Sequence, residues 1–214
     1  MQLKDTGNRT DLGSGGLRDI NSENGRCDLL PAYVMAKMTE KIVADPANNK
    51  SPILSGVLFN LFRYMETKCE QFLFDCLPCM SVYHWDKNSN TELETDSDVI
   101  AANTILDLSV HYKRGAEKYA ERNWEKGIPT HSFIDSAIRH LCKELLGWTD
   151  EPHDIACLWN ICGLIWTLKY RPDLDDMPNY SDTERRPTGE VKEKDTEAEN
   201  KVEKDSENNI YSGN

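Results

Sequence analysis

One histidine and three acidic residues recur at helical spacing between positions 140 and 154. His140 and Glu144 are four residues apart, and Glu151 and Asp154 are three apart. Residues three or four apart project from the same side of a helix. A connection of roughly four residues between two helices makes the helices antiparallel neighbours. The spacing therefore predicts that these four side chains converge.

Such a cluster could hold a divalent cation. Carboxylates that lie this close repel one another unless a cation lies between them, and Mg²⁺ prefers oxygen ligands and retains several waters. A histidine suits Mn²⁺ better but excludes neither ion. A purely structural interpretation is also open, because acids in the first turn of a helix stabilise its dipole. Under that interpretation Glu144 pairs with Lys143 or faces water, and His140 is a core histidine.

The segment that ends in RNWEKG offers groups that could bind a nucleotide. Tyr119 and Trp124 present flat faces for stacking a base, and Asn123 has the donor and acceptor that read a base edge. Lys118 and Arg122 could contact phosphates. The alternative is that both aromatic residues belong to the core.

Two further patterns are less specific. Cys76 and Cys79 form a CxxC pair, with Cys69 and His84 nearby. A zinc knuckle needs a second pair, which is absent, so free thiols are the better interpretation of this pattern.

The dipeptide His153–Asp154 invites comparison with the HD-type phosphohydrolases. Those enzymes need further histidine and aspartate ligands on separate helices. His111, His140 and Asp135 are available for that role, but their spacing does not require it.

Helices must position all of these residues, because the chain shows apolar residues at spacings of three and four and no alternating strand pattern. Gly127 and Gly147 are expected to end two of the helices. The last helix is apolar on almost every face, which is typical of a central helix in a bundle or of a subunit interface. The predicted class is all-α, with helices at about 31–44, 53–75, 98–126, 131–146 and 151–170.

A chain of 214 residues can bury one core of ordinary size. Residues 181–214 hold ten acidic and six basic residues, a net charge of −4 within a total of −12, and one aromatic residue. A segment of this composition is expected to be disordered. The predicted organisation is a flexible arm at 1–25, an all-α domain at 26–175 that contains a helical insertion at 45–98, and a disordered acidic tail at 176–214.

The acidic balance argues against a nucleic acid polymer as partner, since phosphate backbones need a basic face. It does not argue against a small nucleotide, whose phosphates bound cations can neutralise. No apolar stretch is long enough for a membrane span or a signal core. The seven cysteines suggest reduced thiols. We therefore expect a cytoplasmic protein (in the host cytoplasm if the source is viral).

The run GAEKYAERNWEKGIP, then FIDSAIRHL, then DEPHDIACLWN resembles the phage-type dATP/dGTP diphosphohydrolase N-terminal domain family. The upstream piece GLRDINSENGRCDLLP is similar to the same family, so the resemblance covers about 11–44 and 105–170. It implies removal of pyrophosphate from a purine deoxynucleoside triphosphate.

The chain is also similar to the wider MazG-like pyrophosphohydrolases, which are all-α bundles with an EExxE motif on one helix and ExxD on the next. Glu151–Pro152–His153–Asp154 matches the second motif. The first motif departs from the pattern, with His140, Leu141 and Glu144 at its three positions.

The resemblance implies a reaction assisted by Mg²⁺ (or Mn²⁺) in a homo-oligomer, with water attacking the α-phosphorus. An HD-type triphosphohydrolase and a non-catalytic nucleotide-binding module remain the alternatives. The expected catalytic residues are Glu144, Glu151 and Asp154, and the expected metal ligands are these three with His140. The expected substrate-binding residues are Lys118, Tyr119, Arg122, Asn123, Trp124, Arg18 and Arg26.

Overall fold

The computed structural model describes residues 9–11, 14–19, 25–45, 51–89 and 96–179. The chain divides into two units, residues 1–181 and 182–214, and all described residues belong to the first. Most of the predicted acidic tail lies outside the described residues, as does part of the predicted N-terminal arm.

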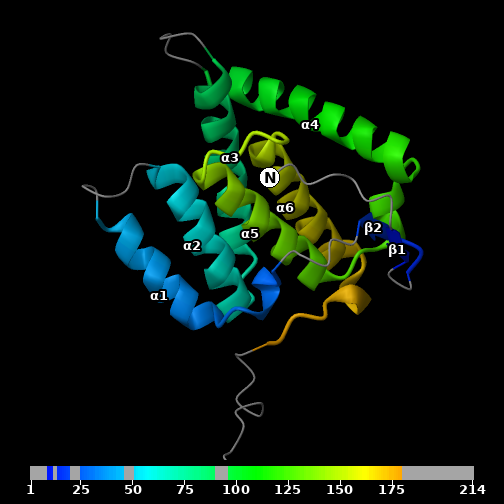
Figure 1. The fold of residues 1–214 in the computed structure, drawn as a ribbon, viewed down its shortest axis with the longest axis horizontal. Coiled ribbons are helices and arrows are strands. Elements are labelled where there is room, and N and C mark those ends of the chain that lie inside the picture. Colours follow the sequence, from blue (N-terminus) through cyan, green and yellow to red (C-terminus); the bar gives the residue numbers. More distant parts are fainter. Residues whose placement is uncertain (1–8, 12–13, 20–24, 46–50, 90–95, 180–214) are drawn as a thin grey trace, which may run out of the picture. The chain divides into compact units, whose positions relative to one another are not determined.

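The described part of the chain is helical, which confirms the predicted all-α class (Figure 1). A small antiparallel hairpin, which the sequence did not predict, pairs β1 (Arg9–Asp11) with β2 (Leu17–Asp19). None of the described helices is long and apolar enough to cross a membrane. The α-helices are α1 (Ala32–Val43), α2 (Pro52–Thr67), α3 (Gln71–Asn88), α4 (Ser97–Tyr119), α5 (Thr130–Leu145) and α6 (His153–Tyr170). Short 3₁₀ turns occur at η1 (Cys27–Leu29), η2 (Asn123–Lys126) and η3 (Pro172–Leu174).

The long helix predicted at 53–75 is wrong, because two helices occupy the region. The chain breaks at Lys68, which adopts a left-handed conformation with φ of +56°. α3 continues past Pro78 to Asn88, through residues for which the sequence predicted no helix. Apolar spacing continues across Lys68, so the pattern could not reveal this break.

The helix predicted at 98–126 also ends earlier than expected. α4 stops at Tyr119, and Ala120 and Arg122 both have positive φ before η2 begins. Non-glycine residues seldom adopt positive φ, so composition gave no sign of this turn. Gly127 and Gly147 have positive φ of +103° and +73°, as expected of residues that end helical segments.

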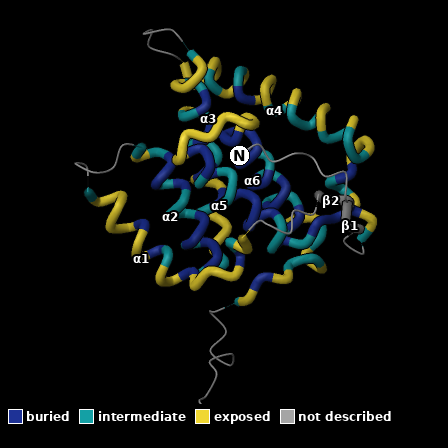
Figure 2. Tube along the Cα trace, viewed as in Figure 1, coloured by how far each residue is buried: buried dark blue, intermediate teal, exposed yellow. Residues whose placement is uncertain are grey.

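α5 and α6 form the centre of the bundle. α5 buries one apolar side against α6, whereas α6 is buried on nearly all sides (Figure 2). α3 and α4 also contact α6, and α2 contacts α5. The interior position of α6 confirms one of the two interpretations of its apolar pattern. The buried apolar residues of the pair include Phe133, Ile134, Ala137, Ile138, Leu141, Cys157, Leu158, Ile161 and Leu164.

The close contact between α5 and α6 depends on Gly163. A Cβ atom built there lies 2.3 Å from Cε1 of Phe133, a ring with no solvent exposure. Gly163→Ala is therefore expected to lower the free energy of unfolding by about 1–3 kcal/mol, although alanine favours helix. Gly115→Ala in α4 is the matched control: nothing lies within 4 Å, so a gain of up to about 1 kcal/mol is expected. Urea unfolding measures both, and unchanged stability of Gly163→Ala would contradict the packing argument.

The chain after α6 is tied to the start of α5. Asp175 accepts hydrogen bonds from Lys68 (2.8 Å) and Thr130 (2.8 Å), and Asp176 contacts the ring and backbone N–H of His131. Met177 is buried. Asp176 and Met177, which the sequence analysis assigned to the tail, therefore pack against the helical domain.

Candidate metal site at the start of α6

Three of the side chains at the junction of α5 and α6 point toward one another. Nδ1 of His140 lies 3.1 Å from Nδ1 of His153 and 3.4 Å from Oε1 of Glu151. Nδ1 of His153 lies 3.5 Å from the same carboxylate oxygen. Among the described residues, this is the group of histidine, cysteine and acidic side chains whose geometry could hold a metal ion.

Asp150 fixes the orientation of His153. Its Oδ1 lies 2.8 Å from Nε2 of His153, which is fully buried. This contact keeps the proton on Nε2 and leaves the lone pair of Nδ1 facing His140 and Glu151. Metal-binding histidines commonly have such a carboxylate behind them.

The donor separations also fit a metal ion. Two ligands about 2.1 Å from a common ion are roughly 3.0–3.4 Å apart in tetrahedral or octahedral geometry. The three separations, 3.1, 3.4 and 3.5 Å, are close to this range. Two nitrogens and one carboxylate suit Mn²⁺ or a related transition metal better than Mg²⁺.

The other two predicted ligands, Glu144 and Asp154, face α3. Nζ of Lys87 lies 2.7 Å from Oε1 of Glu144 and 3.3 Å from Oδ1 of Asp154. Tyr83 donates a hydrogen bond to Glu144 (2.8 Å), and His84 contacts Asp154 (2.7 Å). A lysine ammonium thus occupies the place between the two carboxylates where the sequence predicted a metal ion. The single four-residue cluster that was predicted is therefore divided into two groups.

Glu144 retains one unsatisfied atom. Its Oε2 is buried without a hydrogen-bond partner among the described residues, whereas Oε1 binds Lys87 and Tyr83. A buried carboxylate oxygen without a partner costs stability. Because Oε2 has no such partner, Glu144 could still contribute this atom to a bound cation.

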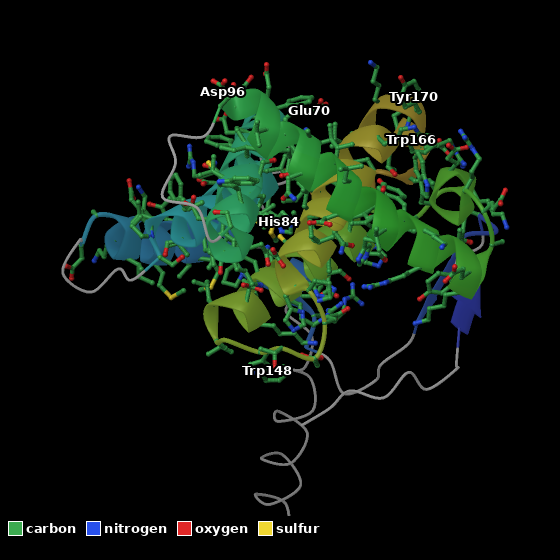
Figure 3. The ribbon with its side chains drawn as sticks, turned by 90° about the horizontal axis from the view of Figure 1, so that it is seen from above. Glu70, His84, Asp96, Trp148, Trp166 and Tyr170 are labelled. Carbon is green, nitrogen blue, oxygen red and sulfur yellow. The ribbon has the colours of Figure 1, made fainter. Side chains whose placement is uncertain are left out.

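His84, which is labelled in Figure 3, lies between two carboxylates. Nδ1 contacts Asp154 and Nε2 lies 2.9 Å from Oδ2 of Asp107 in α4. The hydrogen bond to Asp154 raises the pKa of His84 above its ordinary value of 6.5, and burial opposes this only partly. Burial by itself would raise the pKa of Asp154, but the hydrogen bond from His84 and the charge of Lys87 outweigh it and lower the pKa below 3.8.

The raised pKa of His84 gives the stability of the fold a definite pH dependence. A raised pKa in the folded state means that His84 stabilises the fold fully below about pH 6.5 and loses this effect as pH rises through the folded-state pKa. The thermal midpoint of the wild type should therefore fall from pH 6.5 toward pH 9 more steeply than that of His84→Gln. The variant should be less stable at pH 6. Parallel curves for the two proteins would contradict the charged assignment.

The residues predicted to bind the base do not reach this region. The ring of Trp124 packs edge-on against Trp166 (5.0 Å between centroids) and Tyr112 (5.7 Å). Trp166 is thirteen residues beyond His153, which is about 20 Å along α6. In Figure 3, Trp166 lies at the end of α6 away from Trp148, which precedes α6. Trp124 therefore belongs to an aromatic cluster of the core, as the structural alternative held.

The other predicted residues of that segment lie at the end of α4 and at η2. Arg122 has an exposed side chain that pairs with Glu125, and Asn123 is buried. Lys118 and Tyr119 end α4, with Nζ of Lys118 5.2 Å from the Tyr119 ring centroid.

The structure describes the side chain of only one of the two N-terminal arginines that were predicted to bind substrate. Arg26 forms a bidentate pair with Asp28, with both contacts at 2.6 Å. The adjacent backbone N–H of Cys27 donates to Asp135, which links this region to α5. Arg18 lies in β2, and its side chain is outside what the structure describes.

The HD-type and zinc alternatives receive little support from the geometry. Of the residues available to an HD-type site, His140 meets His153, whereas His111 lies against Trp159 and Asp135 binds Arg139 (2.5 Å). All seven cysteines are free thiols, as predicted, and Cys76 is buried.

Sequence reasoning missed the residues that α3 contributes. Tyr83, His84 and Lys87 reach Glu144 and Asp154 from more than fifty residues away in the chain. These three residues are separated by one, three and four positions, which places them on one face of a helix. The sequence therefore contained a pattern from which they could have been identified. The signal was missed because no helix was predicted between residues 75 and 98.

Residues 86–177 match the model of the family described as dATP/dGTP diphosphohydrolase, N-terminal. This match confirms the family resemblance inferred from the sequence. It contains Lys87, Glu144 and the whole His140–Glu151–His153 cluster, but not Arg18, Arg26 or His84. Searches of curated proteins and of solved structures gave no match.

Proposed function

We propose that this protein hydrolyses purine deoxynucleoside triphosphates (dGTP or dATP) to the monophosphate and pyrophosphate, with a divalent metal ion bound at the start of α6. The observation that carries the proposal is the convergence of His140, Glu151 and His153 within 4.8 Å, inside the segment that matches a diphosphohydrolase family.

His140, Glu151 and His153 would hold the ion, and Mn²⁺ is the expected preference, with Mg²⁺ as the alternative. When bound, the ion supplies Lewis-acid chemistry that polarises a phosphate oxygen and favours ionisation of water. Glu151 is the most accessible of the three ligands, with 41% of its side chain exposed, so the substrate would approach from its side.

The surrounding residues of the chain would hold the site in place. Asp150 retains the proton on Nε2 of His153, which keeps Nδ1 available as a ligand. Lys143, with Nζ 3.7 Å from Oδ2 of Asp150, supplies a positive charge next to the cluster that favours a phosphate group. Glu144 and Asp154 would act as positioning residues, because Lys87 and His84 neutralise them.

Product analysis with a panel of nucleoside triphosphates tests the proposal. Monophosphate and pyrophosphate should form only with added metal, faster with Mn²⁺ than with Mg²⁺, and best from dGTP or dATP. Turnover that persists in a chelator would overturn the proposal.

The same experiment separates the two alternatives. The pair of facing histidines, His140 and His153, is the one observation that favours HD-type chemistry. Release of a nucleoside and intact triphosphate would identify that reaction. Nucleotide binding without any turnover would identify a non-catalytic module.

A further inference from the structure

Trp148 is the most exposed tryptophan of the chain, and it lies in the connection between α5 and α6. All five tryptophans are among the described residues. Trp148 is 40% exposed, whereas the other four are partly buried. Its neighbours Leu145 and Leu146 are 39% and 71% exposed. Large apolar side chains that gather on a surface commonly mark a site for a ligand or a partner.

The end of α5 fixes the position of this ring. Gly147 has a φ of +73°, and its N–H donates to the carbonyl oxygen of Glu144 (3.0 Å). The N–H of Trp148 donates to the carbonyl oxygen of Lys143 (3.0 Å). These two bonds form a Schellman motif, in which the residue after the glycine commonly packs against the residue five positions earlier. Here Nζ of Lys143 lies over the Trp148 ring, 5.3 Å from its centroid. The ring is therefore oriented before any ligand binds.

The oriented ring is next to the candidate metal site. The same Nζ of Lys143 lies 3.7 Å from Oδ2 of Asp150, and Oδ1 of Asp150 lies 2.8 Å from Nε2 of His153. Trp148 and Glu151 are three residues apart, so their Cα atoms are separated by at most about 11 Å. Figure 3 shows Trp148 at the end of α6 that carries the cluster. A ligand whose phosphate binds at the cluster thus has the ring within reach of its other end.

A nucleobase is the chemical group that suits this ring. Every base has a flat π face, and bases stack on exposed aromatic side chains. Lys143 covers one face of the Trp148 ring, and the exposed part remains accessible to a ligand. Trp124, which the sequence predicted for this role, packs against Trp166 at the other end of α6. A purine offers a larger face than a pyrimidine, so stacking on Trp148 favours purines.

We propose that Trp148 stacks on the base of the bound nucleotide and contributes to a preference for purines. This assignment rests on the proposed function, because the cluster of His140, Glu151 and His153 is what places the phosphates. Trp148 does not touch the reacting phosphorus. It therefore acts on binding of the nucleotide and not on the chemical step.

Steady-state kinetics of Trp148→Ala tests this role. The KM for dGTP should rise by about 5- to 150-fold, the range for loss of one base–aromatic stack, with kcat nearly unchanged. The rise should be smaller for dCTP, and Trp148→Phe should recover most of the affinity because it retains a ring. Tyr33→Ala on α1 is the matched control, since Tyr33 is an aromatic residue with 58% exposure, and it should leave KM unchanged.

The substitution should leave the fold intact. Trp148→Ala retains Gly147 and both backbone hydrogen bonds of the motif, so circular dichroism should show unchanged helix content. A merely structural role of Trp148 would lower kcat or the helix content and would not discriminate dGTP from dCTP. Either that pattern or a wild-type KM for Trp148→Ala would overturn the assignment.

Calorimetric titration with dGMP in the presence of Mn²⁺ separates this proposal from the proposed reaction. If the wild type binds dGMP and Trp148→Ala binds it at least about fivefold more weakly, the base site stands even when no triphosphate is hydrolysed. If the wild type hydrolyses dGTP but Trp148→Ala has unchanged KM and unchanged dGMP affinity, the reaction stands and the base site is overturned. A wild type that neither binds dGMP nor hydrolyses any triphosphate would overturn both.

Discussion

Glu151→Gln should reduce metal-dependent turnover by at least about a hundredfold, because mutation of residues that only support a metal ligand already costs 10- to 100-fold. Glutamine has the shape of glutamate but lacks the charge that would hold the ion beside His140 and His153. The side chain of Glu151 is 41% exposed, so the substitution should not disturb the fold. Initial rates of pyrophosphate release at saturating Mn²⁺ measure the effect.

Glu40→Gln provides the control for this experiment. Glu40 belongs to an exposed pair with Lys37 on α1, where half of each side chain is accessible. Its removal should leave the rate unchanged. Equal rates for Glu151→Gln and the wild type, with unchanged dependence on metal, would exclude Glu151 as a ligand and place the chemistry elsewhere.

Lys87→Met should produce the largest loss of stability. Glu144 and Asp154 have only 5% and 2% of their side chains exposed, and Lys87 contacts both. Removing one partner of a buried ion pair leaves an uncompensated charge, which costs about 3–5 kcal/mol. Since Lys87 itself is 36% exposed, the lower end, about 3 kcal/mol, is expected. Urea unfolding in the presence of a chelator measures it.

Adding Mn²⁺ or Mg²⁺ to Lys87→Met tests whether Glu144 and Asp154 can bind a cation. If Glu144 and Asp154 can accept a cation once Lys87 is gone, the ion should recover part of the lost stability. Lys37→Met, which breaks only the exposed pair with Glu40, is the control and should leave the unfolding midpoint unchanged. Wild-type stability of Lys87→Met would show that the two acids need no counter-charge.

The sequence was sufficient to predict the class and the central helices. Apolar spacing predicted α1, α5 and α6 to within two residues at each end, and the uniformly apolar α6 lies inside the bundle as expected. The short connection between α5 and α6 brought His140 close to Glu151, as predicted. These features depend on residues that are near one another in the chain, where helical periodicity fixes relative direction.

Only the tertiary structure decided which side chains neutralise the acids. Glu144 and Asp154 share the α5–α6 junction with His140 and Glu151, but they turn toward α3, and Lys87 and His84 lie between or beside them. It also decided that Trp124 packs in the core and that Ile105 and Leu106 of α4 are exposed. The spacing of apolar residues predicts which residues share a face of a helix. Which other segment packs against that face depends on contacts between parts of the chain that are distant in sequence.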